Sequence, residues 1–171
     1  MNFEAFHSPS ERIPEGVRFR SITTNDLPFL RQLYASTRAQ EMDMLDWTNE
    51  QKDAFISMQF EAQHDYYTRQ FSKAEFLIVE WHAQPAGRVY IDRRATEIRL
   101  VDIALLPAFR NRGLGGSLME ELLHEGQSSM LPVTIHVEKN NPAMHLYTRL
   151  GFKAIEEQGV YDLMKWQPEV I

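Results

Sequence analysis

The sequence of 171 residues contains no cysteine, and this absence excludes several kinds of chemistry. Without thiols the chain has no disulfide bond, no thiolate metal site and no cysteine nucleophile. The lack of cysteine agrees with a reducing compartment, so we expect a cytoplasmic protein. The six histidines are scattered along the chain, and none stands at a spacing typical of metal ligands. We therefore expect no metal.

Long hydrophobic runs and an excess of positive charge are also missing. No apolar run approaches the roughly 20 residues that a helix needs to cross a bilayer. The first 16 residues lack the basic and apolar regions of a secretory signal, so we expect no membrane partner. The formal net charge is −6. Such a charge argues against a nucleic-acid partner, because binding to phosphates needs a basic protein surface.

What the chain does contain is enough apolar material for a core. Hydrophobic residues make up 43% of the sequence and aromatic residues 11%, and the length suits one compact domain. No internal repeat, low-complexity tract or long linker divides it. We predict a short N-terminal arm at residues 1–16 and a single domain at residues 17–171.

Hydrophobic periodicity and turn residues predict an alternation of strands and helices. The predicted strands are 17–22, 76–81, 87–91, 98–106, 133–137, 152–155 and 160–166. A first predicted helix begins at residue 27. Three more cover about 50–70, 114–123 and 142–150, and the last has proline in its first turn and glycine at its end. The segment 98–106 is almost continuously apolar, which is typical of a strand buried on both faces. A turn at 82–86 and helices between later strands predict an α/β (α+β) fold with a mixed sheet.

The most informative segment is a glycine-rich turn, Arg110-Asn111-Arg112-Gly113-Leu114-Gly115-Gly116, between a predicted strand and a predicted helix. A turn there directs backbone N–H groups and the positive end of the helix dipole into one concavity, which suits an anion. Glycines allow close approach of a ligand and positive φ angles, although they could serve only a tight turn and close packing. The segment is not a Walker loop, because Lys-Ser/Thr is missing. Its G-x-G-G spacing also differs from the dinucleotide fingerprint.

Two segments resemble motifs of the GCN5-related N-acetyltransferase (GNAT) family. Arg110-x-x-Gly113-x-Gly115 is similar to its Q/R-x-x-G-x-G/A motif, and the preceding Asp102–Pro107 is similar to its fourth strand. Asn141-Pro142-Ala143-x-x-Leu146-Tyr147-x-x-Leu150-Gly151-Phe152 resembles its N-x-x-A-x-x-L-Y-x-x-x-G-F segment. The resemblance covers roughly residues 98–155. It implies the acyl-CoA N-acyltransferase fold, a mixed and mostly antiparallel central sheet of about seven strands with helices on both faces. It also implies transfer of an acetyl group from acetyl-CoA to a primary amine.

The resemblance also implies which residues bind acetyl-CoA. Backbone amides of the glycine-rich turn would hold the pyrophosphate. A bulge in the fourth strand would separate it from the fifth, and the pantetheine arm would bind in that gap. Asn141 would also contact the pantetheine, or it could cap the following helix, a role open to Asn140 as well. The implied cofactor-binding residues are Ile103, Leu105, Arg110, Asn111, Arg112, Gly113, Leu114, Gly115, Gly116 and Asn141.

For the chemistry, the resemblance implies that Tyr147 is the general acid that protonates the leaving thiolate, although it could be a core tyrosine. The general base stays open between two residues and a water chain to solvent. Asp102 is a candidate because its strand face carries apolar neighbours, which would place an acid in apolar surroundings (Ile98, Leu100, Ala104 and Leu106). His136 is a candidate because it is central in the next strand and histidine titrates near neutral pH. Either residue could instead be structural.

The acceptor is open between a small-molecule amine and a peptide or protein amine. A polar-aromatic cluster, His64-Asp65-Tyr66-Tyr67, could line its site, and three acids in the preceding connection could attract a cation: Glu41, Asp43 and Asp46. A solvated loop is the alternative for these charges. We expect direct attack in a ternary complex, because no cysteine can carry the acetyl group. A homodimer, a non-catalytic acetyl-CoA sensor of the same fold, and an enzyme for another acyl-CoA are the remaining alternatives.

Overall fold

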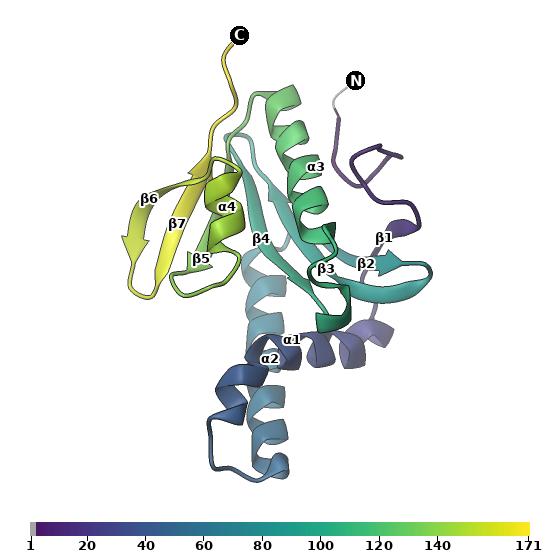
Figure 1. Cartoon of the computed structure of the whole chain (residues 1–171), viewed down its shortest axis with the longest axis vertical. Helices are drawn as coiled ribbons and strands as arrows, with labels where there is room; N and C mark the ends of the chain where they lie inside the picture. The colour runs from purple at the N-terminus through teal and green to yellow at the C-terminus, as the bar shows by residue number, and fades with distance from the viewer. Residues whose placement is uncertain (1–2) are drawn as a thin grey trace.

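A computed structural model describes residues 3–171 and contains one seven-stranded sheet, in the order β1-β2-β3-β4-β5-β7-β6 (Figure 1). Only the pair β4–β5 is parallel, and the other pairs are antiparallel. This is the mixed, mostly antiparallel sheet that the sequence predicted. The strands are β1 (Val17–Ser21), β2 (Glu75–Trp81), β3 (Gln84–Arg93), β4 (Ile98–Leu105), β5 (Val133–Glu138), β6 (Lys153–Gln158) and β7 (Tyr161–Trp166).

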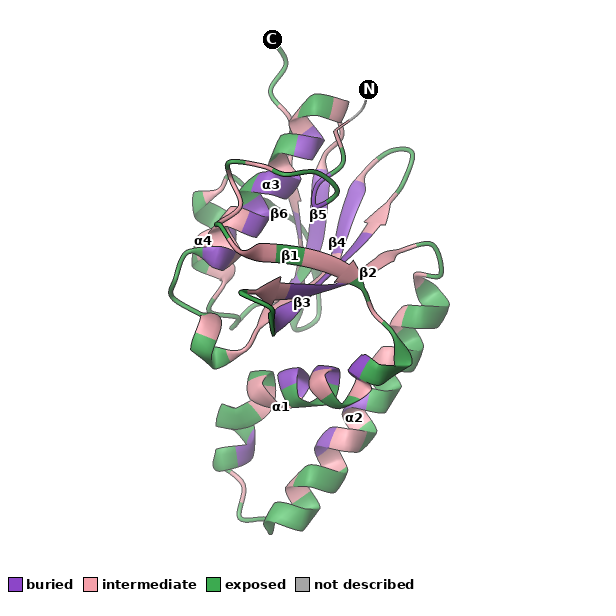
Figure 2. Ribbon diagram, turned by 90° about the vertical axis from the view of Figure 1, so that its right-hand side faces the viewer, coloured by how far each residue is buried: buried purple, intermediate pink, exposed green. Residues whose placement is uncertain are grey.

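Four α-helices cover the sheet, α1 and α2 on one face and α3 and α4 on the other (Figures 1 and 2). Their bounds are α1 (Leu27–Asp43), α2 (Asn49–Gln70), α3 (Leu114–Ser129) and α4 (Met144–Arg149). The Thr48 side chain accepts a hydrogen bond from the Gln51 amide and so caps α2. Short 3₁₀ turns precede α1 and α3, at Thr24–Asp26 and Pro107–Phe109.

The two helical layers produce two hydrophobic cores, because neighbouring residues of a strand point to opposite faces of the sheet. Ile78 and Val79 on β2 are both fully buried, yet Ile78 packs with α1 and α2, and Val79 belongs to the core under α3. The larger core receives one stripe of α3, formed by Leu114, Leu118, Met119 and Leu122. The sheet is therefore the rigid frame that places both helical layers.

The segment before β1 packs against the body of the protein. Ala5 is fully buried, and its amide donates a hydrogen bond of 2.8 Å to the Glu125 carboxylate on α3. Ser10 Oγ and Arg12 Nε donate to Glu121 on the same helix, at 2.7 and 2.8 Å. Two buried acids of α3 thus hold this segment, which the sequence indicated only as an arm.

Two element boundaries differ from the prediction. The hairpin turn contains only His82 and Ala83, both at positive φ (51° and 65°), so β3 begins at Gln84 instead of residue 87. A bulge in the β2–β3 pair then accommodates Pro85, since proline tolerates sites where the ladder is interrupted. Helix α4 begins at Met144 rather than residue 142, because Asn141 starts a separate turn ahead of it.

The burial predicted for the strand at 98–106 is wrong for its second half. Only Ile98, Arg99 and Leu100 are buried, and the remaining residues of β4 are half-buried. The reason is that β4 pairs with β5 through these first three residues alone, opposite 133–135. Beyond Leu100 the strand has no neighbour on that side among residues 3–171. The two strands separate where the sequence suggested continuous burial.

Candidate functional site

The separation of β4 from β5 follows a β-bulge. Tyr90 of β3 is opposite Asp102, and Ile91 is opposite Leu100, so Val101 has no partner in the register. An extra residue of this kind bends a strand and increases its twist. The bulge that the family resemblance implied for this strand is therefore present, and it opens a gap between β4 and β5.

The backbone of β4 turns polar groups toward this gap. The Leu106 amide donates to the Ala86 carbonyl of β3 at 2.8 Å. Because successive residues of a strand direct their N–H and C=O groups to alternate sides, Ile103 and Leu105 direct theirs away from β3. The Leu105 carbonyl already accepts a hydrogen bond of 2.8 Å from Arg110 Nε. The Ile103 N–H and C=O are thus the main-chain groups best placed for a bound chain in the gap.

The glycine-rich turn leads directly into α3. Gly113 has φ of +81°, and Asn111 also has a positive φ of 58°. The first amide with an acceptor inside the helix is that of Ser117, bonded to the Gly113 carbonyl at 3.0 Å. Amides of the first turn, 114–116, therefore point outward without an intrahelical partner, as at any helix N-terminus.

The glycines of this turn have open space where a side chain would begin. A Cβ atom added to Gly113 or Gly116 would meet no heavy atom within 4 Å, and one added to Gly115 would meet only the Leu105 side chain at 3.9 Å. Close helix–sheet packing, the alternative reason for the glycines, is therefore not what they serve. Free donors in open space at the positive end of a helix fit a phosphate group.

Two of the predicted cofactor contacts need correction. The Arg110 amide donates to the Pro107 carbonyl at 3.2 Å. The Arg110 guanidinium donates to the Leu105 carbonyl and, at 3.3 Å, to Ser36 Oγ on α1. Arg110 thus ties the turn to α1 and has no free amide for a pyrophosphate. The Asn141 side-chain oxygen accepts the Ala143 amide at 2.9 Å within the turn before α4, and the N-cap of α4 itself, Ala143, has no side-chain cap. The NH₂ group of Asn141 is thus the part of its side chain left for a ligand.

The Arg112 side chain lies against two aromatic rings, those of Trp81 and Phe109. Its guanidinium carbon lies 4.6 Å from the centre of the Trp81 ring and 5.9 Å from that of Phe109. Such stacking contacts fix the long side chain over the end of β2. Its charge stays within reach of the turn, which suits an anionic ligand.

Tyr147 lies on α4 with 3% of its surface exposed, and its ring meets Phe152 edge to face at 5.8 Å. Burial raises the pKa of the phenol above its ordinary value, and the negative charge of Asp102 raises it further. The residue is thus both part of the core and close enough to Asp102 to be influenced by its charge. A raised pKa keeps the hydroxyl protonated, which a general acid requires.

Asp102 does not have the apolar surroundings that the sequence suggested. Residues 98 and 100 belong to the core under α3, but the bulge at Val101 reverses the alternation, so Asp102 faces the α1–α2 side. There it forms an ion pair with Arg88, whose Nε lies 2.6 Å from the carboxylate oxygen Oδ2. The apolar stripe therefore gives no reason to regard Asp102 as a base.

His136 is also paired with an arginine. Nη1 of Arg99 lies 3.1 Å from His136 Nδ1. A guanidinium can only donate, so Nδ1 is the acceptor and the ring proton resides on Nε2. Partial burial and the Arg99 charge lower the pKa of His136 below its ordinary value. The lone pair that a general base would use is already committed to Arg99.

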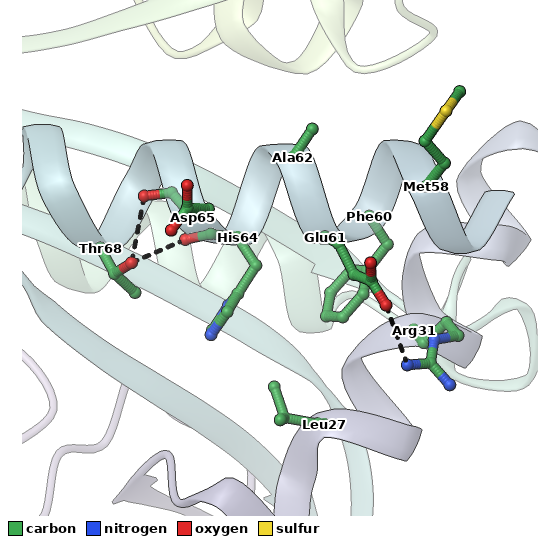
Figure 3. Close-up of a pocket in the computed structure, with 9 residues that line it drawn as sticks. All are labelled: Leu27, Arg31, Met58, Phe60, Glu61, Ala62, His64, Asp65 and Thr68. Carbon is green, nitrogen blue, oxygen red and sulfur yellow. Dashed lines mark hydrogen bonds and ion pairs between the residues drawn. The ribbon is translucent and has the colours of Figure 1, made fainter. Parts of the chain in front are cut away.

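The predicted acceptor cluster is divided by the structure. His64 and Asp65 line a shallow depression of about 580 Å³ between α1 and α2 (Figure 3), and none of its lining residues belongs to β4, β5 or α4. Tyr67 instead meets Tyr90 edge to face at 6.0 Å, near Arg88, and Tyr66 is exposed. The three acids of the α1–α2 region, Glu41, Asp43 and Asp46, are exposed, and Glu41 pairs with Arg38 at 3.0 Å.

The residue that the sequence analysis missed is Arg88. The sequence analysis placed Arg88 in a predicted strand without giving it a function. The feature that could have indicated one is a charged residue inside an otherwise uncharged strand, Gly87-Arg88-Val89-Tyr90-Ile91. Among residues 3–171, no three His, Asp or Glu side chains gather closely enough to hold a metal ion. No helix in this part of the chain is long and apolar enough to cross a membrane.

Comparisons with known proteins match this architecture. Mycothiol acetyltransferase of Saccharomonospora viridis is 26% identical over 90% of this chain and 51% of its own length. The Corynebacterium aurimucosum enzyme of the same name is 33% identical over 52% of this chain and 27% of its own length. The chain thus spans about half, or less, of the curated relatives it matches.

Solved structures share the fold at low sequence identity. The PaiA N-acetyltransferase of Thermoplasma acidophilum, in complex with coenzyme A, is 18% identical with a TM-score of 0.66, covering 88% of this chain and 98% of that one. A GNAT acetyltransferase of Elizabethkingia anophelis with acetyl-CoA bound is 15% identical with a TM-score of 0.57, over 90% and 99%. The model of the acetyltransferase (GNAT) family matches residues 40–152, so this chain belongs to that family.

Proposed function

We propose that this protein transfers an acetyl group from acetyl-CoA to a primary amine. The observation that carries the proposal is the outward-facing amides at the start of α3, with open space before Gly113 and Gly116, next to the gap between β4 and β5. A diphosphate bound at the turn places the rest of an extended cofactor along that gap. Family membership supports the same chemistry.

The residues present fit coenzyme A. The amides of residues 111–116 and the Arg112 charge suit the diphosphate, and the Ile103 carbonyl suits an amide N–H of the pantetheine arm. The NH₂ group of Asn141 is a further donor at the end of β5. When bound, acetyl-CoA supplies the acetyl group as a reactive thioester.

The chain then contributes two groups to the reaction. A free main-chain N–H in the gap, at Ile103, stabilises the negative charge that develops on the carbonyl oxygen as the amine nitrogen bonds to the carbonyl carbon. The Tyr147 hydroxyl gives its proton to the sulfur as the carbon–sulfur bond breaks, and recovers one from solvent. Since both candidate bases are paired with arginines, the amine loses its proton to water.

Two measurements test the proposal. Thermal unfolding with acetyl-, propionyl- and succinyl-CoA reports binding, because a ligand of the native state raises the apparent stability by mass action. A library of amines and peptides, followed by detection of released thiol, reports turnover. We expect stabilisation by acetyl-CoA and thiol release with at least one amine. Stabilisation without any thiol release would favour the non-catalytic sensor, and no stabilisation would contradict the cofactor site.

The role of Tyr147 has its own test. Tyr147→Phe removes the hydroxyl and leaves the ring in the core, so we expect cofactor affinity to stay within about twofold. General acid catalysis contributes typically ~10²–10⁴-fold, so kcat should fall by about 100-fold or more. Turnover equal to that of the wild type would remove Tyr147 from the acid role and leave it as a core residue.

A further inference from the structure

Arg88 is a buried cation at the centre of the sheet, with 3% of its surface exposed. Its Nε lies 2.6 Å from Asp102 Oδ2, and its Nη2 lies 2.8 Å from Gln63 Oε1 on α2. Its guanidinium carbon is 4.9 Å from the centre of the Tyr90 ring and 6.0 Å from that of Tyr67. A buried charge is stable only with such partners, so the arrangement is built around the guanidinium.

The ion pair between Arg88 and Asp102 uses only one of the two carboxylate oxygens of Asp102. Both Arg88 contacts fall on Oδ2, and Oδ1 accepts no hydrogen bond from residues 3–171. The Asp102 side chain is 22% exposed, in contrast to the buried arginine. An oxygen of a partly exposed carboxylate that accepts no hydrogen bond is available to a ligand.

Asp102 lies beside the gap, on the face of the sheet that α1 and α2 cover. Asp102 follows the bulge at Val101, next to Ile103 and the gap. Apart from burial, the main cause that raises the pKa of Tyr147 on α4, and that of Tyr67 on α2, is the charge of Asp102. Asp102 thus lies near both the proposed acid and the α1–α2 layer, from which an acceptor would approach.

We propose that Arg88 is a positioning residue that acts through Asp102. By binding Oδ2, it holds the carboxylate in place at the bulge and turns Oδ1 toward the acceptor, where Oδ1 accepts a hydrogen bond from the attacking amine. The amine nitrogen keeps its lone pair for the carbonyl carbon. The carboxylate orients the amine and does not take its proton. This inference rests on the proposed acetyltransferase function.

Asp102→Asn is the sharpest test. An asparagine can keep its oxygen toward Arg88, but it then presents NH₂ donors where Oδ1 was free. Loss of one hydrogen bond to a charged group corresponds to about a 10- to 100-fold effect, so kcat/KM for the amine should fall by that factor. The cofactor Kd should stay within about twofold. Asp92→Asn is the matched control, since Asp92 of β3 is likewise half-buried and paired with an arginine, Arg94, at 2.9 Å.

Arg88→Gln gives a second readout. A carboxylate without its guanidinium partner is no longer held in one orientation, so kcat/KM for the amine should fall by about 10- to 100-fold while the cofactor Kd stays within about twofold. The groups that face Asp102 are the Arg88 guanidinium, the phenols Tyr67, Tyr90 and Tyr147, and the Gln63 amide beyond Arg88. The guanidinium is the one cation among these groups, so Arg88→Gln removes that charge and keeps a side chain that can form hydrogen bonds. Arg88→Lys should recover part of the rate, because lysine keeps the charge but not the fork of donors.

The outcomes separate the two claims. A wild-type protein that releases thiol, with an equally active Asp102→Asn, contradicts only this inference. Equal losses of cofactor affinity and amine turnover in folded Asp102→Asn would mean that Asp102 merely supports the bulge, which also overturns it. If Arg88→Gln does not fold, Asp102→Asn alone decides. A wild-type protein that releases no thiol with any amine contradicts the proposed function and this inference together.

Discussion

Gly113 and Gly159 form a natural pair for testing the phosphate site. Both have positive φ, +81° and +64°, and a Cβ atom on either would meet no heavy atom within 4 Å. Alanine in this conformation costs about 1–2 kcal/mol at either position. For a chain of this size that corresponds to a fall in Tm of roughly 2–4 °C per kcal/mol. Gly113→Ala and Gly159→Ala should therefore lose similar stability.

Only Gly113→Ala should affect coenzyme A. Its methyl group would occupy the space before the free amides of α3 and displace a phosphate oxygen, whereas Gly159 lies in the β6–β7 turn. Loss of one hydrogen bond to a charged group costs about 1.5–3 kcal/mol, or roughly 10- to 100-fold in Kd. Calorimetric titration with coenzyme A measures this difference. Equal Kd values for both variants and the wild type would refute the assignment of the turn.

Two further predictions concern stability. Phe6→Ala should cost about 3 kcal/mol in urea unfolding, because the ring is buried in the core under α3, and exposed Met44→Ala should cost little. A loss below about 1 kcal/mol would contradict the packing of the N-terminal segment. The Arg20 ion pair lowers the pKa of Asp26 to about 2. Its stabilisation is thus present above about pH 4 and lost as the pH falls toward 2. Asp26→Asn should cost on the order of 1–2 kcal/mol at pH 7 and almost nothing near pH 2, and a difference independent of pH would be incompatible with the pair.

The sequence by itself determined the features that depend on neighbours along the chain. Helical and strand periodicity predicted the elements in their order, because amphipathic spacing is a local property. The glycine-rich turn could also be predicted, because glycines before a helix favour positive φ and the first amides of a helix have no intrahelical partner. Gly113 does adopt a positive φ. Tyr147 was identified through its motif; its side chain is buried, and its role as the acid stays a prediction.

Only the tertiary structure decided which side chains meet. One unpaired residue, Val101, reverses the alternation of β4 and moves Asp102 from the predicted apolar stripe to the opposite face. Arg88 and Arg99 then pair with Asp102 and His136, so each candidate base already has an arginine partner. These contacts depend on register and bulges between strands far apart in the sequence, and a shift of one residue exchanges the two faces of a strand. The periodicity of a single strand contains no information about that register.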